Sequence, residues 1–297
     1  MSTSRYRCFV AVAHHGSLSA AARALGVSQP TVSAQIHTLE RQSRVELFQR
    51  RGYRMSLTDA GKKLLVLAQK LLATQAEAEF FLRDCGQLNQ GLLKLGAVGP
   101  FHVIEMVAAY RQHHPRMQIS IRMGNSQQVL RSLEHYDTDV AVLAGEHQHP
   151  GVLVIPYASH PIVLFAPVTH PLAAYDVVPF SALHGLPLIQ REVGSTTRTV
   201  LEQTLHAAGV QVHTSLEIGS REAIREAVAL GLGVGAVSEA EFIADPRYKL
   251  VRIEGSPAAT STSIYVMAER CESLLIRSFI RSTRAASAWA KVLGQSV

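Results

Sequence analysis

Residues 17–37 read SLSAAARALGVSQPTVSAQIH, and this stretch decides the fold of the N-terminal part of the chain. Ser17 can cap a short helix over residues 18–25, and Gly26 can end it. Ser28 then offers a second cap, followed at once by Gln-Pro in the first helical turn. Two helices separated by so tight a turn predict a helix-turn-helix.

A further helix is predicted before this stretch. Tyr6, Phe9, Val10 and Ala13 recur at helical spacing, and the pattern stops at Gly16. In the helix after Ser28, three apolar residues at positions i, i+4 and i+7 should pack on the helix before it. These are Val32, Ile36 and Leu39, expected to contact Ala21, Ala22 and Leu25.

The outward face of that third helix carries short polar or small side chains, which suit contacts with base edges and phosphates. A plain helical hairpin is the alternative interpretation. The residues on this face are Gln29, Pro30, Ser33, Ala34 and His37.

Residues 47–57, LFQRRGYRMSL, predict two short strands around a glycine turn, which would form a wing. Arg50, Arg51 and Arg54 lie at its tip and would contact phosphates or the minor groove. A solvated basic loop is the alternative. Charge favours the wing, because residues 1–63 hold ten Lys and Arg against three acidic residues, while the whole chain has a net charge of +6.

Over residues 9–61 the sequence resembles the LysR-type transcriptional regulators, and the resemblance continues along the whole chain. The turn, Ser-Gln-Pro, Leu-Glu, Leu-Phe-x-Arg and Leu-Thr-x-Ala-Gly all occur in that family's order and spacing. Ala34 stands where many members carry a long basic residue. The resemblance implies DNA-facing positions at Gln29, Pro30, Thr31, Ser33, Ala34 and His37, with Arg50 and Arg54 on the wing. We also predict DNA contacts for Ser28 and Arg51.

A long helix is predicted from about Asp59 to Asp84, with Thr58 as its cap. One narrow stripe of it alternates by four and three residues, which predicts pairing with a second copy; packing on its own domain is the alternative. Pairing would set the spacing of two DNA half-sites. The family resemblance implies a tetramer made of two dimers. The predicted dimerisation residues are Leu64, Ala68, Leu71, Gln75, Ala78 and Leu82.

From Gly91 onward, short apolar runs alternate with helical segments, which predicts an α/β domain with largely parallel sheets. The expected strands are LLKLGAV, MQISIRM, DVAVLAG, IVLFAP, LPLIQ, VGAVS and SIYVMA. The resemblance implies a two-lobed domain like the type 2 periplasmic binding proteins. We place the two crossings between lobes near Ala166-Pro167 and Ser263–Val266, and a final helix over Leu274–Leu293.

The predicted fold class is therefore α/β with an N-terminal all-α winged helix-turn-helix. The predicted divisions are a winged helix-turn-helix over 1–58, a linker and dimerisation helix over 59–90, and an effector-binding domain over 91–297, with lobe 1 about 91–166 and 267–297 and lobe 2 about 167–266.

Four strand-to-helix junctions of this domain supply hydroxyls, backbone donors and arginines with few acids, a composition that favours a small anion. Ordinary helix capping explains each junction by itself, and only the family fold brings them to one cleft. The candidate effector-binding residues are Gly99, Pro100, Phe101, His102, Asn125, Ser126, Gln127, Arg191, Ser195, Thr196, Thr197 and Ser220.

The segments MGNSQQVL, REVGSTTR and EIGSREAIREAVALGLGV are similar to LysR regulators associated with 2-aminoethylphosphonate catabolism. That resemblance implies an effector with a phosphonate dianion and an ammonium group. Glu192 or Glu222 would then meet the ammonium group. The regulated genes would serve catabolism or transport.

Two other classes of function stay open: a solute-binding module, or an enzyme with an appended DNA-binding domain. The sequence lacks G-x-S-x-G, H-E-x-x-H and Walker patterns, and its fourteen histidines and three cysteines show no metal-ligand spacing, so we predict no catalysis, cofactor or metal site. No apolar run is long enough for a membrane span and no export signal is visible, so we expect a cytoplasmic protein. The expected partners are double-stranded promoter DNA, a small anionic effector and further copies of the chain, with RNA polymerase as a candidate and no membrane.

Overall fold

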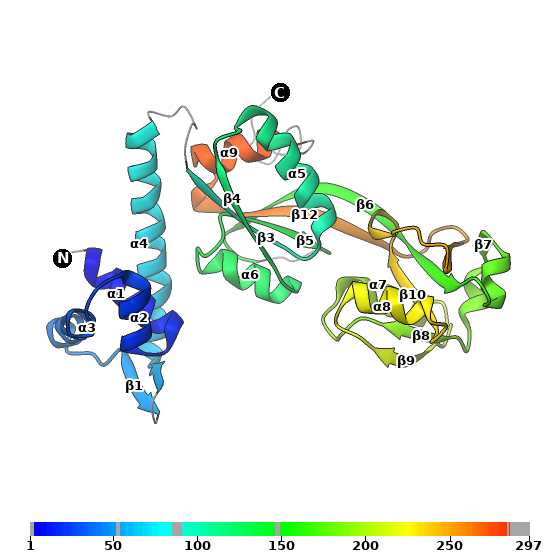
Figure 1. The fold of residues 1–297 in the computed structure, drawn as a ribbon, viewed down its shortest axis with the longest axis horizontal. Helices are drawn as coiled ribbons and strands as arrows, with labels where there is room; N and C mark the ends of the chain where they lie inside the picture. Colours follow the sequence, from blue (N-terminus) through cyan, green and yellow to red (C-terminus); the bar gives the residue numbers. More distant parts are fainter. Residues whose placement is uncertain (1–2, 52–53, 85–90, 146–148, 284, 286–297) are drawn as a thin grey trace. The chain divides into compact units, whose positions relative to one another are not determined.

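The computed structural model describes residues 3–51, 54–84, 91–145, 149–283 and 285, in two compact units. The first unit is built mainly from the chain up to Leu92. Its elements are, in order, α1 (Thr3–His15), α2 (Leu18–Leu25), α3 (Gln29–Ser43), the hairpin strands β1 (Phe48–Arg51) and β2 (Arg54–Leu57), and α4 (Asp59–Asp84) (Figure 1).

The three predicted helix caps of this unit are confirmed. The hydroxyls of Ser17, Ser28 and Thr58 each accept a hydrogen bond from the backbone N–H three residues further on, at 3.2, 3.3 and 3.0 Å. Each bond satisfies an N–H group that the first helical turn leaves without an internal partner. Gly26 ends α2 with a φ of 66°, a conformation that glycine adopts without steric cost.

The core of the first unit is mostly the predicted one. Val32, Ile36 and Leu39 are buried together with Ala21 and Ala22. Leu25 is the exception, since 36% of it is exposed. The reason is local: α2 ends at Leu25 and the chain turns away immediately after it, so this side chain lies at the rim of the core.

The hairpin is joined closely to the start of α4. The backbone N–H of Thr58 donates to the carbonyl of Leu47 at 3.0 Å. A Cβ added at Gly61 would lie 2.1 Å from that same carbonyl oxygen, so no side chain fits there. The glycine of the Leu-Thr-x-Ala-Gly sequence is therefore required by close packing between α4 and the base of the wing.

The second unit is an α/β domain (Figure 1). Its helices are α5 (Pro100–His113), α6 (Ser126–Glu134), α7 (Thr196–Ala207), α8 (Arg221–Ala229) and α9 (Leu274–Arg281), with short 3-10 turns η1 (Pro171–Ala174), η2 (Phe180–Leu183), η3 (Glu239–Glu241) and η4 (Ala268–Arg270). Its strands are β3 (Leu92–Ala97), β4 (Gln118–Met123), β5 (Val140–Ala144), β6 (Val152–Pro167), β7 (Val177–Val178), β8 (Pro187–Gln190), β9 (His213–Glu217), β10 (Val234–Ser238), β11 (Tyr248–Ile253) and β12 (Ala259–Met267).

The main sheet has the strand order β4-β3-β5-β12-β6-β10-β8-β9, with β11 and β7 branching from β6. Strands β3 and β5 pair in parallel, as do β10, β8 and β9. Strand β6 pairs antiparallel with β10, β11 and β12, and β12 pairs antiparallel with β5, whereas β11 pairs in parallel with β7. The sheet is therefore more mixed than predicted. Parallel pairing across β8, β9 and β10 directs the strand ends toward the N-termini of α7 and α8.

The crossings between the two halves of the sheet differ from those predicted. Strand β6 pairs with β12 up to Pro161, and from Ile162 onward it pairs with β10 and then β11. The predicted crossing at Ala166 therefore falls inside the second half, where this residue is buried. The predicted crossing at Ser263 pairs with β5 in the first half. One continuous strand serves both halves, and its buried run begins where it leaves β12, so the predicted strand covered only the second half of β6.

Other differences concern strands that the sequence pattern does not predict. Strand β9 is exposed throughout, and Lys249 and Arg252 interrupt β11, so neither was predicted. The N-terminal half of β6 was also missed. The predicted final helix begins at Leu274 as expected but ends at Arg281, with Ser282 as its C-cap. Residues 284 and 286–293 of the predicted helix lie outside the described residues. Within the described part of the chain, no helix is both long and apolar enough to span a bilayer.

Candidate DNA-binding and effector-binding sites

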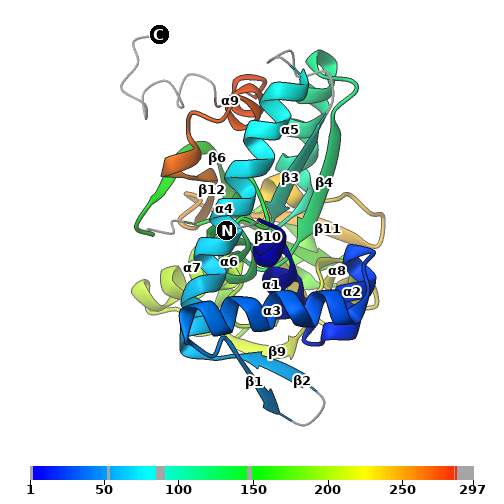
Figure 2. The same cartoon turned by 90° about the vertical axis from the view of Figure 1, so that its left-hand side faces the viewer.

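The predicted DNA-facing side of α3 lies on the outside of the first unit. Figure 2 shows α3 running across the near side of this unit with the β1–β2 hairpin beside it. Ser33 is half-buried, whereas the other predicted positions are exposed. The exposed ones are Ser28, Gln29, Pro30, Thr31, Ala34 and His37. The helix thus presents a polar, narrow surface of the kind that fits a major groove.

Two hydrogen bonds order the N-terminal end of this surface. The hydroxyl of Ser19 in α2 donates to Oε1 of Gln29 at 2.8 Å. That bond engages the amide oxygen of Gln29 and leaves its NH₂ group as a donor for a base or phosphate. The hydroxyls of Ser28 and Thr31 lie 2.8 Å apart and hold each other at the first turn.

The wing is present as the β1–β2 hairpin, in which Arg50 pairs with Met55 and Arg51 pairs with Arg54. Arg54 is exposed. The turn at residues 52–53 and the side chains of Arg50 and Arg51 lie outside the described residues.

A residue of α3 that the sequence did not single out fixes the wing. Oε1 of Glu40 accepts the backbone N–H groups of Leu47 and Phe48 at 2.9 and 3.3 Å. This carboxylate therefore joins the recognition helix to the first strand of the hairpin. The Leu-Glu pair of the family signature was the available signal for it.

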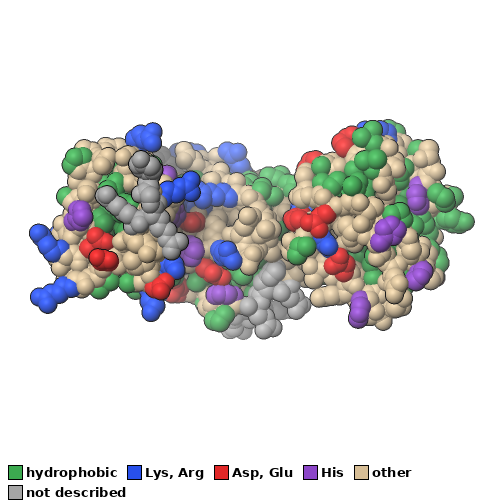
Figure 3. Space-filling view, turned by 90° about the horizontal axis from the view of Figure 1, so that it is seen from below, with side chains coloured by type: hydrophobic (Ala, Val, Ile, Leu, Met, Phe, Trp, Pro, Cys, Tyr) green, Lys and Arg blue, Asp and Glu red, His purple; other side chains and the backbone are tan. Residues whose placement is uncertain are grey.

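Basic side chains gather on the surface of the first unit. Arg23, Arg41, Arg44 and Arg54 are all exposed. Lys and Arg side chains are visible on the part of the surface at the left of Figure 3. Such a surface attracts the phosphate backbone of a duplex independently of its sequence.

The predicted seam on α4 divides into two parts. Ala68 lies in the core of the first unit, and the half-buried Leu64 packs against that core. Leu71 and Leu82 are 44% and 75% exposed, and Ala78 is also exposed, whereas Gln75 is half-buried. The exposed apolar stripe of α4 consists of Val66, Leu67, Leu71, Ala78, Phe81 and Leu82. We call it the α4 stripe.

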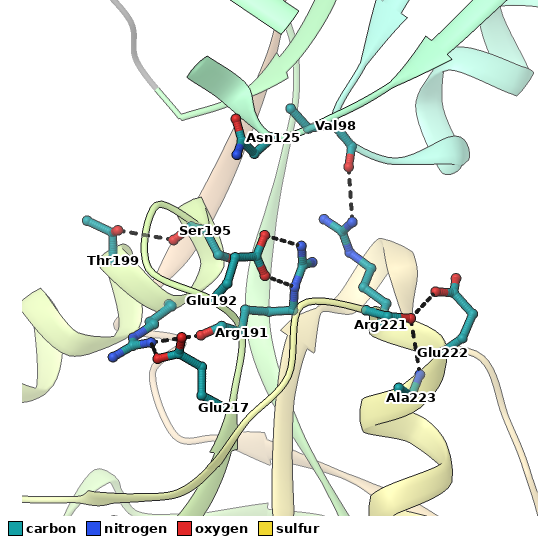
Figure 4. Close-up of polar contacts among 12 residues, drawn as sticks. Val98, Asn125, Arg191, Glu192, Ser195, Thr199, Glu217, Arg221, Glu222 and Ala223 are labelled. Carbon is teal, nitrogen blue, oxygen red and sulfur yellow. Dashed lines mark hydrogen bonds and ion pairs between the residues drawn. The ribbon is translucent and has the colours of Figure 1, made fainter. Parts of the chain in front are cut away.

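In the second unit, the predicted junctions are brought together at the N-termini of α5 to α8 (Figure 4). The hydroxyl of Thr196, in the first turn of α7, donates to the carbonyl of Ala144 at 3.0 Å and lies 3.4 Å from the hydroxyl of Ser126. Nη1 of Arg221, in the first turn of α8, donates to the carbonyl of Val98 at 3.0 Å. Ser126 begins α6, and Val98 precedes α5.

The remaining predicted residues occupy different environments. Phe101 and Gln127 are exposed, and Ser195 and Thr197 are buried. Asn125 is used locally, because its Oδ1 accepts the N–H of Gln128 at 2.9 Å. Gly99 and Pro100 form the N-terminal end of α5, and Ser220 caps α8.

His102 lies inside the domain instead of in the group of junctions. It is 7% exposed, and its ring stacks on that of His160 with centroids 5.2 Å apart. Tyr157 contacts it edge-on. His102 belongs to the buried face of α5, together with Val103, Met106 and Tyr110.

Arginines and glutamates alternate around the junctions (Figure 4). Arg191 holds Glu192 through two hydrogen bonds of 2.7 and 2.8 Å. Burial raises the pKa of Glu192, but the hydrogen bonds and charge of Arg191 outweigh it, so the net pKa is lowered. Nε of Arg221 donates to Oε2 of Glu241 at 2.8 Å. Burial lowers the pKa of Arg221, and the neighbouring carboxylate partly offsets that change.

Arg198 fixes the loop that carries several of these residues. Its Nη1 donates to the carbonyl of Arg191 at 2.9 Å and to Glu217 at 2.7 Å, and its Nε donates to Glu202 at 2.8 Å. The loop between β8 and α7 is thereby tied to β9. Among the residues that the structure describes, no group of three or more His, Cys, Asp or Glu side chains could hold a metal ion.

Comparison with known families identifies the chain. Residues 3–62 match the bacterial regulatory helix-turn-helix protein, lysR family, and residues 86–288 match the LysR substrate binding domain. The chain belongs to the LysR family of transcriptional regulators. It is therefore a DNA-binding regulator with an effector-binding domain and not an enzyme.

Curated relatives agree on the family. A probable RuBisCO transcriptional regulator from Nostoc is 35% identical over 243 residues, which cover 78% of this chain and 72% of the relative. The transcriptional activator CmpR from Synechocystis is 30% identical over 236 residues, covering 79% and 78%. Several relatives are probable RuBisCO transcriptional regulators, so these relatives do not support the predicted 2-aminoethylphosphonate subgroup.

Solved structures share the fold. Full-length OxyR from Pseudomonas aeruginosa has a TM-score of 0.76 at 24% identity, covering 97% of each chain. Full-length CbnR in complex with its target DNA has a TM-score of 0.70 at 19% identity, covering 96% of this chain and 100% of that one. The regulatory domain of CcmR from Synechocystis, in complex with 2-PG, has a TM-score of 0.60 at 24% identity, covering 67% and 97%.

Proposed function

We propose that this regulator senses a small organic anion bearing a phosphate-like group at the N-termini of α5, α6, α7 and α8, and that the anion changes its affinity for promoter DNA. The observation that carries the proposal is the meeting of the α6 and α7 N-termini, where the hydroxyls of Ser126 and Thr196 lie 3.4 Å apart. Helix N-termini and hydroxyls together favour anions. Arg221 adds a cation from α8.

An effector without an ammonium group fits this site better than 2-aminoethylphosphonate. Both carboxylates predicted to meet an ammonium group are already engaged. Arg191 holds Glu192 bidentately, and Glu222 accepts a hydrogen bond from Ser220 at 2.8 Å. We therefore favour an effector of the chemical class of 2-PG, the compound bound in the CcmR domain.

The regulator would act on DNA as a dimer paired through the α4 stripe, because an exposed apolar stripe on a long helix is costly unless it is covered. One winged unit contacts one half-site, and two units contact a palindrome. Two such dimers would form a tetramer. Within each chain, residues 1–58 would form the winged helix-turn-helix, residues 59–90 the linker and dimerisation helix, and residues 91–297 the effector-binding domain.

The effector would act by changing contacts that already link the two halves of the sheet. The bond from Thr196 to the carbonyl of Ala144 and the bond from Arg221 to the carbonyl of Val98 are such contacts. An anion that recruits the Thr196 hydroxyl or the Arg221 guanidinium alters them. A ligand shifts a conformational equilibrium only through such a difference in contacts.

Fluorescence anisotropy with the chain's own promoter and a scrambled duplex tests both parts of the proposal. We expect promoter affinity roughly 10³-fold above that for the scrambled duplex, and a change of about 5- to 150-fold on adding 2-PG. Equal affinity for both duplexes would contradict the proposed DNA recognition. A panel of 2-PG, 2-aminoethylphosphonate and sulfate at one ionic strength identifies the effector class.

A matched pair of variants locates the anion. Thr196→Val removes the hydroxyl at the junction, whereas Thr199→Val removes one a turn later that donates to the carbonyl of Ser195 at 3.0 Å. We expect Thr196→Val to raise the concentration of 2-PG that gives half of the change in promoter affinity at least about tenfold. That increase corresponds to a loss of about 1.4 kcal/mol in binding free energy. The second should leave the response intact. Equal responses in both variants would place the anion elsewhere.

A further inference from the structure

A pocket lined in part by Arg221 lies among β6, α8, β10 and β11. Three aromatic rings form one wall: the ring centroids of Phe165 and Tyr248 are 5.3 Å apart, and that of Phe242 lies 6.3 and 6.0 Å from them. The pocket was not apparent from the sequence, because its walls come from distant segments. We call it the aromatic-arginine pocket; Arg191, Arg221, Arg225, Glu241 and Ile243 are among its other lining residues.

The three arginines of the pocket differ in how closely carboxylates hold them. Arg191 is held by Glu192, and Arg221 by Glu241. Arg225 makes longer contacts, from Nη2 to Oε1 of Glu222 and from Nε to the carbonyl of Arg221, each 3.4 Å. Its side chain is 22% exposed. Arg225 is thus a largely buried cation with weak hydrogen-bond geometry, next to an apolar wall.

Glu241 takes up space that another anion could use. Its side chain is 17% exposed, and its Oε1 would lie 2.5 Å from a Cβ at Gly99. The space among the lining residues, counted out to the open mouth, is about 410 Å³. A ligand that pairs with Arg221 needs the Glu241 carboxylate to move away, and that carboxylate is at the end of a flexible side chain.

We propose that the aromatic-arginine pocket binds an organic anion that carries a flat apolar group, and that Glu241 is its built-in competitor. The anionic group of the ligand replaces Glu241 on Arg221 and also reaches Arg225, since guanidinium groups bind carboxylates and phosphates through paired hydrogen bonds. The flat group lies against Phe165, Phe242 and Tyr248. This inference rests on the proposed function in one respect, that an anion at Arg221 acts as effector.

Calorimetric titration of the full chain with phenyl phosphate and with inorganic phosphate tests the pocket. We expect phenyl phosphate to bind at least about tenfold more tightly. Ile243→Trp should abolish that preference by filling the mouth and leave phosphate binding unchanged. Ile243 is 54% exposed, so the larger side chain is compatible with folding. Equal affinity of the two probes, or a preference that survives Ile243→Trp, overturns the proposal.

A second pair of variants tests the competitor. Glu241→Gln should tighten binding of phenyl phosphate severalfold, because it removes the charge that occupies Arg221. Glu239→Gln is the control, since Glu239 belongs to the same short turn but pairs with Arg252 at 2.6 Å. If Glu241→Gln leaves the affinity unchanged or lowers it, Glu241 is not a competitor. Pocket-dependent binding without any change in promoter affinity would instead contradict the proposed effector function and leave the pocket assignment standing.

Discussion

Oε1 of Glu40, in the recognition helix, accepts the backbone N–H of Leu47 at 2.9 Å, just before the first strand of the wing. A second N–H, that of Phe48, reaches the same oxygen at 3.3 Å. The two DNA-contacting elements are therefore held in register by one carboxylate. Hydrogen bonds to a charged group contribute more than those between neutral groups.

Replacing this carboxylate should loosen the wing. We expect Glu40→Ala to lower the free energy of unfolding by about 1.5–3 kcal/mol, because two backbone donors lose a charged acceptor. Urea denaturation of the full chain measures the change. Glu46→Ala is the matched control, since Glu46 is exposed and its backbone carbonyl, not its side chain, accepts from Thr58. Equal stability of the two variants would contradict the role given to Glu40.

Phosphate contacts and base contacts should respond differently to mutation. Arg54→Ala should weaken binding to the promoter and to a scrambled duplex alike, and reduce the slope of log affinity against log salt by about 0.9. Gln29→Ala should cost about 1–3 kcal/mol on the promoter only. Anisotropy titrations at several salt concentrations check both. If the salt dependence of the Arg54→Ala variant has the same slope as that of the unmodified chain, Arg54 does not contact a phosphate group.

The α4 stripe should govern self-association. Leu71→Glu places a charge on the exposed apolar stripe, so we expect the dissociation constant of the dimer to rise at least about tenfold. Ala68→Glu places a charge in the core of the first unit, where Ala68 is 1% exposed, and should lower the melting temperature instead. Sedimentation and thermal melting separate the two effects. A Leu71→Glu variant that dimerises normally would show that the stripe is not the interface.

The ion pair of Arg191 and Glu192 should make the free energy of unfolding depend on pH. The folded-state pKa of Glu192 is lowered, so the pair contributes its full stabilisation above the ordinary value of 4.5 and loses it as the pH falls below that value. We expect the melting temperature of Glu192→Gln to be lower than that of the unmodified chain at pH 7. The difference should shrink steadily below pH 4.5. A gap that stays constant down to pH 3 would contradict this assignment.

Local signals made the first unit predictable. Ser17, Ser28 and Thr58 cap helices through bonds within three residues, and the apolar spacing of Val32, Ile36 and Leu39 identified the core. The same kind of apolar spacing led to the prediction that Leu64 and Ala68 of α4 contact a second chain, whereas they pack on the core of the first unit. A narrow apolar stripe looks alike whether it covers its own domain, as Leu64 and Ala68 do, or a second chain.

The second unit depended on contacts that sequence patterns do not reveal. Arg221 was visible at a predicted junction, but its partner Glu241 lies twenty residues later in a short turn. The crossings were misplaced because β6 continues as one strand through Pro161, while its fully buried run, the part predicted as a strand, begins only after that residue. Most of the predicted effector residues lie at the N-terminal ends of α5 to α8. Arg191 lies in the loop before α7, and the side chain of His102 is on the buried face of α5.

Strand β6 belongs to both halves of the sheet without interruption over residues 152–167, and β12 runs beside it as far as Pro161. The halves are thus joined by hydrogen-bonded ribbon and not by loose chain. Rotating one half against the other would twist this pair of strands and strain its hydrogen bonds. A ligand that changed the angle between the halves would have to supply that strain energy from its own binding, and its release would let the strands relax.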